Sequence, residues 1–180
     1  VSCVLSFKEM SAPATAPQYL PARYEEKLRQ LAAPLRPRNF LPSTETLPLA
    51  GVTLRADKYY ELARSWKMTV PFIGADWEMV VAELLPEAKR RGVVSLQVVL
   101  NTGCPAIGAA TELLRTQGFF FGGLAPRWFG ADGVMMQQLF DSEPDYEETK
   151  LYSQEAKDLM AFIRADKAAL AAEMGRRQEN

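Results

Sequence analysis

The sequence predicts an α/β fold with a mixed, twisted sheet and flanking helices, and three consecutive segments carry this prediction. Residues 93–100 form an almost unbroken apolar run, which is typical of a strand buried on both faces. Residues 105–117 begin with a proline that can open a helix and then place apolar side chains at helical spacing. Residues 118–139 contain two apolar stretches around a Gly-Ala-Asp-Gly sequence. They predict a hairpin that closes the sheet, with Asp132 and Gly133 as its turn.

The chain of 180 residues suits one domain with attached segments. Residues 1–50 are expected to form a strand at 1–8 and then a proline-rich arm, because seven of the twelve prolines fall between residues 9 and 50. Residues 51–140 are the expected α/β core. Residues 141–180 are expected to hold an acidic connector and a long C-terminal helix.

Two short helices are expected ahead of the buried strand. Pro21 can occupy the first turn of a helix that places Tyr24, Leu28 and Leu31 on one face. The segment between Thr53 and Ser65 predicts a second short helix over residues 57–64, with Tyr60 turned inward.

A strand and a longer helix are expected next. Residues 66–70 predict a strand that ends at Pro71. Asp76 is a good N-cap for a helix that runs to about Arg91. Its inward face is apolar at helical spacing, with Trp77, Val80, Val81, Leu84 and Leu85. Because Pro86 lies inside this pattern, we expect the helix to kink or break near Leu85.

The end of the chain predicts a connector and a helix. Residues 141–148 hold five acidic residues and no basic ones, which is typical of a solvated connector. Residues 152–174 then predict an amphipathic helix that ends at Gly175. Its apolar side chains recur every three to four residues: Tyr152, Ala156, Leu159, Ile163, Leu170 and Met174.

Composition excludes several classes of function. The chain has no histidine, which removes Ser-His-Asp and Cys-His catalysis and histidine zinc sites within it. A net charge of −1 provides no field that would recruit nucleic acid or an anionic membrane. No apolar run approaches the ~20 residues of a membrane span. Cys3 and Cys104 show no metal or disulfide spacing, so we expect reduced thiols, no bound metal and a cytoplasmic location.

The hairpin carries a family resemblance. The Gly118-Phe119 pair directly follows a helix with Leu113 and Leu114, and it begins the string Gly-Phe-Phe-Phe-Gly-Gly-Leu-x-Pro-Arg-Trp-Phe-Gly-x-Asp-Gly. Together with the later Met-Gln, this string resembles the end of a bacterial GNAT-type domain of the acyl-CoA N-acyltransferase superfamily, found in larger multidomain proteins. The resemblance covers roughly residues 66–140. It implies the closing half of the GNAT fold, and the chain, which begins without a methionine, is expected to be part of something longer.

The resemblance also implies a cofactor and its binding residues. GNAT enzymes end one strand in a Gln/Arg-x-x-Gly-x-Gly/Ala loop, whose backbone N–H groups bind the pyrophosphate of acetyl-CoA at a helix N-terminus. The counterparts here are Ile73, Gly74 and Ala75, and Asn101 matches an asparagine near the end of the neighbouring strand. Acetyl-CoA or another acyl-CoA would then place its pantetheine between the strands at 66–70 and 93–100. The implied activity is acyl transfer to an amine.

Two departures from the family pattern keep a second hypothesis open. The loop has one glycine and lacks the upstream Gln or Arg, and Asp76 would compete with a phosphate for the same N–H groups. Leu114 stands where the family often has a general-acid tyrosine, so no catalytic residue is assigned. The alternative is a non-catalytic interaction module that keeps the fold. It would associate through residues 152–174 and the hairpin, either as a homo-oligomer or with a neighbouring domain.

Two further positions have alternative readings. Arg127 and Trp128 near the hairpin tip could bind a ligand or partner, or Trp128 could fold back over the sheet and leave Arg127 in solvent. Cys104 precedes a helix N-terminus, where a thiolate is stabilised, or it is an ordinary buried thiol.

Overall fold

A computed structural model describes residues 14–140, 146 and 149–178. The predicted strand at residues 1–8 and most of the acidic connector lie outside these described residues. The elements follow one another in the order β1 (Ala14–Leu20), a 3-10 turn (Ala22–Tyr24), α1 (Glu25–Ala32), β2 (Arg38–Pro42), β3 (Leu54–Tyr60), β4 (Ser65–Phe72), α2 (Trp77–Arg90), β5 (Ser95–Asn101), α3 (Ile107–Thr116), β6 (Phe120–Phe129), β7 (Ala131–Leu139) and α4 (Gln154–Gln178).

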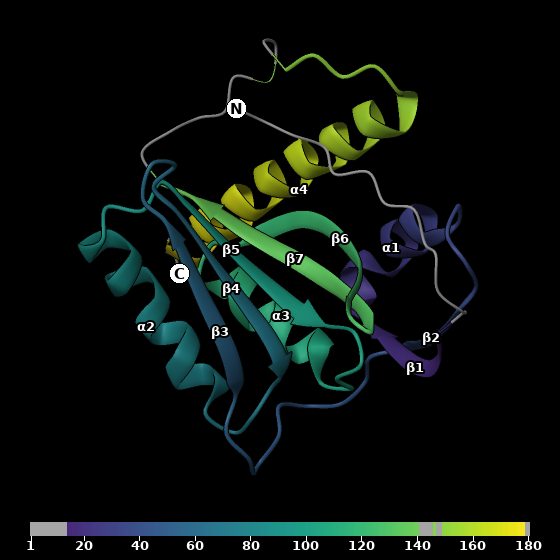
Figure 1. Cartoon of the computed structure of the whole chain (residues 1–180). Helices are drawn as coiled ribbons and strands as arrows, with labels where there is room; N and C mark the ends of the chain where they lie inside the picture. Colours follow the sequence, from purple (N-terminus) through teal and green to yellow (C-terminus); the bar gives the residue numbers. More distant parts are fainter. Residues whose placement is uncertain (1–13, 141–145, 147–148, 179–180) are drawn as a thin grey trace.

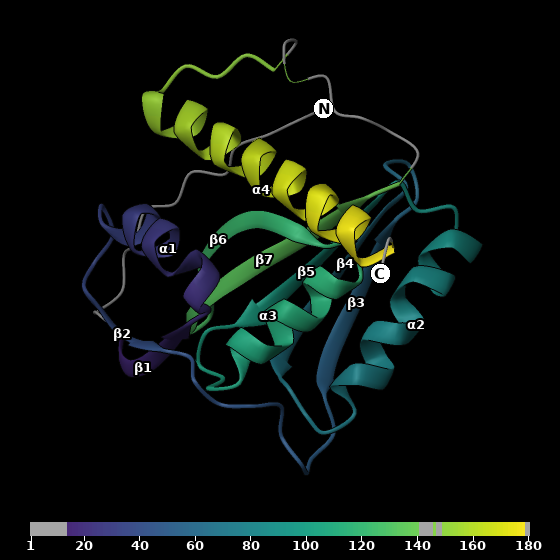
Figure 2. The ribbon, with the colours of Figure 1, turned by 180° about the vertical axis from the view of Figure 1, so that it is seen from behind.

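The predicted α/β class with a mixed sheet is confirmed. Five strands pair in the order β3-β4-β5-β7-β6. Only the pair β4 and β5 is parallel within this sheet, and α2 is its crossover connection. The helices α2, α3 and α4 lie on one face (Figure 2), whereas no helix of the described chain lies over the opposite face (Figure 1).

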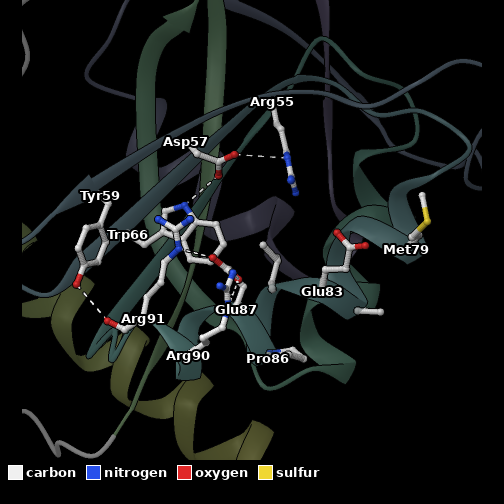
Figure 3. Close-up of a pocket in the computed structure, with 12 residues that line it drawn as sticks. Arg55, Asp57, Tyr59, Trp66, Met79, Glu83, Pro86, Glu87, Arg90 and Arg91 are labelled. Carbon is white, nitrogen blue, oxygen red and sulfur yellow. Dashed lines mark hydrogen bonds and ion pairs between the residues drawn. The ribbon is translucent and has the colours of Figure 1, made fainter.

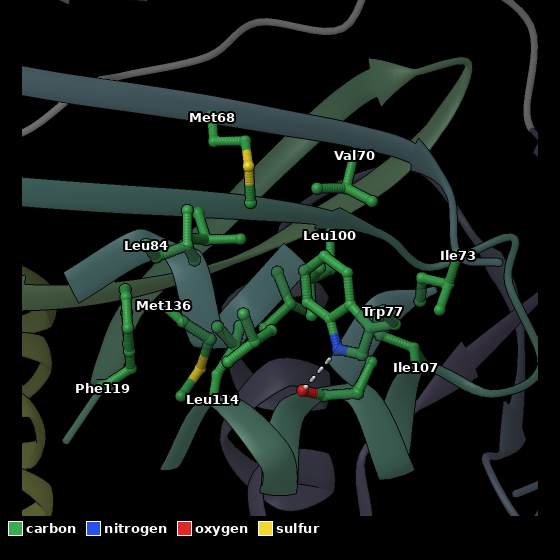
Figure 4. Close-up of a cluster of buried hydrophobic side chains, with 14 of the residues drawn as sticks. Met68, Val70, Ile73, Trp77, Leu84, Leu100, Ile107, Leu114, Phe119 and Met136 are labelled. Carbon is green, nitrogen blue, oxygen red and sulfur yellow. Dashed lines mark hydrogen bonds between the residues drawn. The ribbon is translucent and has the colours of Figure 1, made fainter. Parts of the chain in front are cut away.

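The core fills the space between the helices and the sheet (Figure 4). Met68 and Val70 of β4 and Leu100 of β5 are fully buried there, facing the apolar stripes of α2 and α3. Trp77 is the largest fully buried side chain of the described residues, and its Nε1 donates a 3.4 Å hydrogen bond to Ala110 O. The indole therefore fixes α2 against α3 while covering the ends of the central strands.

The proline-rich arm forms a small sheet of its own. β1 and β2 pair in parallel, and Tyr19 N donates to Thr102 O, which joins the arm to the end of β5. The predicted short helix is confirmed as α1 with the preceding turn. Tyr24 and Leu28 are fully buried and Leu31 packs against the core, as the spacing predicted.

The predicted helix at residues 57–64 is wrong. This segment belongs to β3 and to the turn before β4, where Arg64 adopts a positive φ of 44°. Alternation along β3 directs Asp57 and Tyr59 to the face that carries α2, and both pair with residues of β4. Cross-strand pairing with a distant segment thus overrides the local helical spacing.

The predictions for β4 and α2 were partly correct. β4 continues through Pro71 to Phe72, and Pro71 lies where the pairing with β3 shifts register, a position that tolerates the missing N–H. α2 runs as one helix through Pro86, so the expected break is absent. Packing on both sides of the proline, by the buried side chains of Leu84 and Ala88, maintains the helix. The inward stripe of α2 is as predicted.

The predicted hairpin turn was placed too far along the chain. The chain reverses at Gly130, where φ is +79° and Phe129 pairs with Ala131. Asp132 and Gly133 lie inside β7 instead, because Asp132 is needed for a buried ion pair. Gly133 is required by close packing, since a Cβ there would lie 2.7 Å from Val99 Cγ1.

The predicted long C-terminal helix is present as α4, which packs along β6. It begins after Tyr152, which is exposed rather than buried, and it continues through Gly175 to Gln178. Asp166 on α4 accepts hydrogen bonds from Phe121 N at 2.7 Å and Tyr24 Oη at 2.9 Å.

Candidate functional site

The candidate site lies where the parallel strands β4 and β5 end. Their pairing runs from Ser65 opposite Ser95 to Val70 opposite Leu100. Beyond this point the chain continues into two loops, residues 73–76 before α2 and residues 102–106 before α3. In an α/β sheet, the carboxyl ends of parallel strands are the usual position of a ligand.

Asn101 bridges the two strand ends. Its Nδ2 donates a 2.9 Å hydrogen bond to Pro71 O, and its Oδ1 accepts a 2.8 Å bond from Gly103 N. The structure therefore brings Asn101 beside the loop that contains the other predicted residues. Its amide is already used to hold the strand ends together.

The loop at residues 73–76 is covered by the chain itself. Gly74 N donates a 2.9 Å hydrogen bond to Thr53 Oγ1, and Ala75 N donates a 3.0 Å bond to Gly51 O. Ile73 is buried in the core. The N–H groups that the family resemblance assigns to a pyrophosphate thus bind residues 51–53 in this structure.

Close backbone packing explains the single glycine of this loop. A Cβ on Gly74 would lie 2.5 Å from both Thr53 N and Val52 C, and 2.7 Å from Gly51 O. All three are backbone atoms, which cannot move aside as a flexible side chain would. The glycine therefore permits a crossing of two chain segments, which is a role distinct from the approach of a phosphate.

Asp76 completes this contact. Asp76 occupies the N-cap position of α2, as predicted, but its side chain makes no capping hydrogen bond within the helix. Its Oδ1 instead accepts a 2.7 Å bond from Thr53 N. Hydrogen bonds from the Thr53 side chain and backbone lower the pKa of Asp76, so the carboxylate is ionised at neutral pH. A negative charge consequently occupies the N-terminal end of α2, where a phosphate would have to bind.

Cys104 and Leu114, the other two positions that the sequence singled out for chemistry, are both buried. Cys104 is buried, and burial raises the pKa of its thiol, which opposes the thiolate that a nucleophile requires. Its Sγ lies 3.4 Å from Pro71 O. Leu114, at the position of the family's frequent tyrosine, is fully buried in the core. The ordinary-thiol reading of Cys104 is the one that this geometry favours.

Arg127 and Trp128 lie elsewhere, at the hairpin tip. Arg127 has a positive φ of 58°, and its backbone N donates to Asp132 Oδ1 at 2.8 Å. Trp128 is 41% exposed, and its ring lies 5.3 Å from Lys67 Nζ. Because Met68 beside Lys67 points into the core, Lys67 and Trp128 are on the opposite, helix-free face of the sheet. Trp128 thus lies over the sheet, which agrees with one half of the second expectation, but Arg127 is half-buried rather than left in solvent.

A groove of about 680 Å³ lies between β3 and α2 (Figure 3). It contains Arg55, Arg90 and Arg91, and each of these cations has a carboxylate partner. Arg55 Nε lies 3.4 Å from Asp57 Oδ2, and Glu87 binds both Arg90 and Arg91. Hydrogen bonds from these two arginines lower the pKa of Glu87, and the bond from Arg91 has the larger effect. The groove is therefore lined by charges that neutralise one another, which is unlike a site built for an anionic cofactor.

Sequence reasoning missed a buried polar junction beneath the hairpin tip. Arg38 and Asp132 form an ion pair there, and Gln18 Oε1 accepts hydrogen bonds from Thr102 Oγ1 at 2.7 Å and from Asp132 N at 2.9 Å. No local signal identifies this group, because its members come from β1, β2, β7 and the loop after β5. It holds the arm to the sheet, and Gln18 Nε2 is its buried polar atom without a hydrogen-bond partner.

Comparisons with known proteins add no relative. No protein-family model matches the chain, and no curated protein and no solved structure matches it. Within the described residues, no group of three or more acidic or cysteine side chains is placed to hold a metal ion. None of the helices described is both long and apolar enough to cross a membrane.

Proposed function

We propose that this chain is a GNAT-like domain that serves as a non-catalytic association module and does not bind acyl-CoA. The GNAT resemblance is supported by the order of elements after residue 54. A hairpin, the crossover helix α2, a parallel strand, a helix and a closing hairpin follow one another. The one parallel pair is β4 with β5, where the resemblance expects pantetheine.

One observation carries the proposal: residues 51–54 cover the loop at residues 73–76 and simultaneously expose apolar side chains. The backbone of Gly51 and the backbone and hydroxyl of Thr53 bind residues 74–76. Val52 lies between Gly51 and Thr53, and Leu54 follows Thr53. The side chains of Val52 and Leu54 are 70% and 59% exposed. The same segment thus binds the N–H groups that the resemblance assigns to a phosphate, and it presents a surface that water solvates poorly.

The neighbouring surface extends this apolar patch. Phe72 pairs with Leu54 across the β3–β4 hairpin and is also exposed. Leu49 lies in the loop before Gly51 and is fully exposed. Exposed apolar side chains that adjoin one another, as Leu54 and Phe72 do, are typical of a protein–protein contact. The association surface proposed here is therefore at β3. α4 and the hairpin tip, expected earlier to serve this role, make contacts within the chain.

Calorimetric titration with acetyl-CoA and with CoA tests the proposal. We expect no binding heat and no shift of the thermal midpoint for the whole chain. The matched comparison is a Thr53→Ala, Asp76→Ala variant, which removes two of the groups that close the loop. Saturable binding of either ligand to the unaltered chain at micromolar concentration would overturn the proposal and favour acyl-CoA binding. Binding to the variant alone would support closure as the reason for the lack of binding.

A further inference from the structure

We propose that β3 is a self-association edge that pairs antiparallel with β3 of a second copy of this chain, about a two-fold axis beside Ala56. This inference rests on the proposed function, because it names the partner of the association surface. The two five-stranded sheets would join into one continuous sheet.

The edge is open for such pairing. β3 lies at the end of the strand order and pairs with β4 alone among the described strands. Every residue of β3 except Tyr59 is exposed. A strand edge carries N–H and C=O groups aligned for another strand, so it is a ready template for a second chain.

Symmetry restricts the registers that are available. A two-fold axis that relates two antiparallel edge strands is perpendicular to the sheet, so it preserves the sheet's two faces. Each residue must therefore lie opposite one whose side chain points to the same face. It follows that the axis passes beside one central residue, which lies opposite its own copy.

Charge selects one of these registers. With Ala56 at the centre, Arg55 of each chain lies opposite Asp57 of the other, so two pairs of opposite charge form. Centring on Arg55, Asp57 or Lys58 would place that charge opposite its own copy, which is destabilising. The central position also suits alanine, because the smallest side chain lies where the two strands meet at the axis.

The charged residues are already positioned for this arrangement. Arg55 and Asp57 point to the face that carries α2, and they form an ion pair within the chain at 3.4 Å. Trp66 Nε1 donates a 2.9 Å hydrogen bond to Asp57 Oδ1, which holds the carboxylate in place. In the dimer the four charges alternate around the axis, so each has two neighbours of opposite sign.

The same register also covers the apolar side chains on the face of β3 opposite Arg55 and Asp57. Leu54 lies opposite Lys58 of the second copy, and Val52 lies opposite Tyr60. Lys58 Nζ is 5.0 Å from the Tyr60 ring in the same chain, so its aliphatic stem extends along this face. Both of the most exposed apolar residues of the segment, Val52 and Leu54, would thereby lose contact with water.

Sedimentation velocity over a range of concentrations tests the charge pairing. The whole chain should dimerise at tens of micromolar or below. Arg55→Asp creates two like-charge contacts and should weaken dimerisation by at least about tenfold. The double variant Arg55→Asp, Asp57→Arg restores opposite charges and should recover most of the affinity. Lys58→Glu changes the net charge equally but places no charge opposite another, so it should have a smaller effect than Arg55→Asp.

A disulfide tests the register directly and does not require intact charges. Directly opposite residues in antiparallel strands have Cα atoms about 4.5–5.5 Å apart, within reach of a disulfide. In a Cys3→Ser background, Ala56→Cys should therefore give a covalent dimer under mild oxidation. Lys58→Cys is the control, since its two copies would lie roughly 13 Å apart.

The outcomes separate this inference from the proposed function. A monomer at all concentrations, an Arg55→Asp variant that dimerises as tightly as the unaltered chain, or equal cross-linking at positions 56 and 58 would each overturn the β3 dimer. A monomer that also fails to bind CoA would leave the proposed function standing with a different partner. CoA binding to the unaltered chain would overturn the proposed function itself.

Discussion

The Arg38 guanidinium and the Asp132 carboxylate form a two-bonded ion pair that is closed to solvent. Arg38 Nε lies 2.8 Å from Asp132 Oδ2 and Nη2 lies 3.1 Å from Oδ1, with side-chain exposures of 1% and 0%. Asp132 Oδ1 also accepts from Arg127 N. The carboxylate thereby joins β2, the hairpin tip and β7 at one point.

Removal of this carboxylate should destabilise the fold strongly. Asp132→Ala leaves a buried guanidinium with no counter-charge, for which a loss of about 3–5 kcal/mol in the free energy of unfolding is expected. Urea denaturation monitored by circular dichroism measures it. Arg55→Ala breaks an ion pair whose side chains are about one-third exposed, so it should cost less than about 1 kcal/mol. Equal losses for the two variants would contradict this account of the junction.

The crossing at Gly74 predicts opposite effects for two Gly→Ala changes. Gly74→Ala introduces a Cβ 2.5 Å from backbone atoms of residues 52 and 53, and should destabilise the fold by about 1–3 kcal/mol. Gly175 lies inside α4 with nothing within 4 Å of a Cβ, so Gly175→Ala should stabilise the fold by up to about 1 kcal/mol. Thermal unfolding of both variants would provide the comparison. Tolerance of alanine at position 74 would show that residues 51–53 do not pack there as described.

The attachment of α4 depends on Tyr24. Its hydroxyl donates to Asp166 Oδ2 and accepts from Arg115 Nη1, and burial, assisted by the Asp166 carboxylate, raises its pKa. Tyr24→Phe leaves both charged groups with one partner fewer, and should cost about 1–3 kcal/mol. Amide exchange should quicken in α4 more than in α2. Tyr152→Phe, at an exposed position, is the control and should change neither quantity.

Stability should decline in acid in part through Asp76. Its pKa in the folded chain is lowered by Thr53 from an ordinary 3.8, so the unfolded chain takes up the proton first as pH falls. The stabilisation is therefore fully present above pH 3.8 and is lost as the pH drops below it, toward the folded pKa. Thermal midpoints of the unaltered chain and Asp76→Asn should differ at neutral pH and converge in this acidic range. A constant difference would exclude the carboxylate as the source.

The sequence predicted well those elements in which apolar side chains recur at regular spacing and are buried on one face. β5, α3 and the stripe of α2 each bury apolar side chains against the same core, so spacing alone identified them. β3 failed because its residues are mostly exposed and its partner is another strand. Nothing in the exposed run from Leu54 to Tyr60 distinguishes a strand edge from a short helix until the pairing with β4 is known.

The sequence predicted where the candidate loop lies on the sheet, but not which groups its N–H donors bind. The sequence predicted that residues 73–75 and Asn101 lie at the same end of neighbouring strands, and the structure places both at the carboxyl ends of β4 and β5. The sequence could not show that Thr53, more than twenty residues earlier, occupies the N–H group of Gly74. Asp132 was misplaced for the same reason, since its ion-pair partner Arg38 lies on another strand of another sheet.

The arm's contacts also set an order of events as the chain folds. Tyr19 bonds to Thr102, while Gln18 and Arg38 bond to Asp132, so each anchor of β1 and β2 lies more than eighty residues further along the chain. During synthesis β1 and β2 are made before β5 and β7, yet their binding surface is complete only once β7 exists. The arm should therefore dock last, and contacts that span so much of the chain should slow the final step of folding.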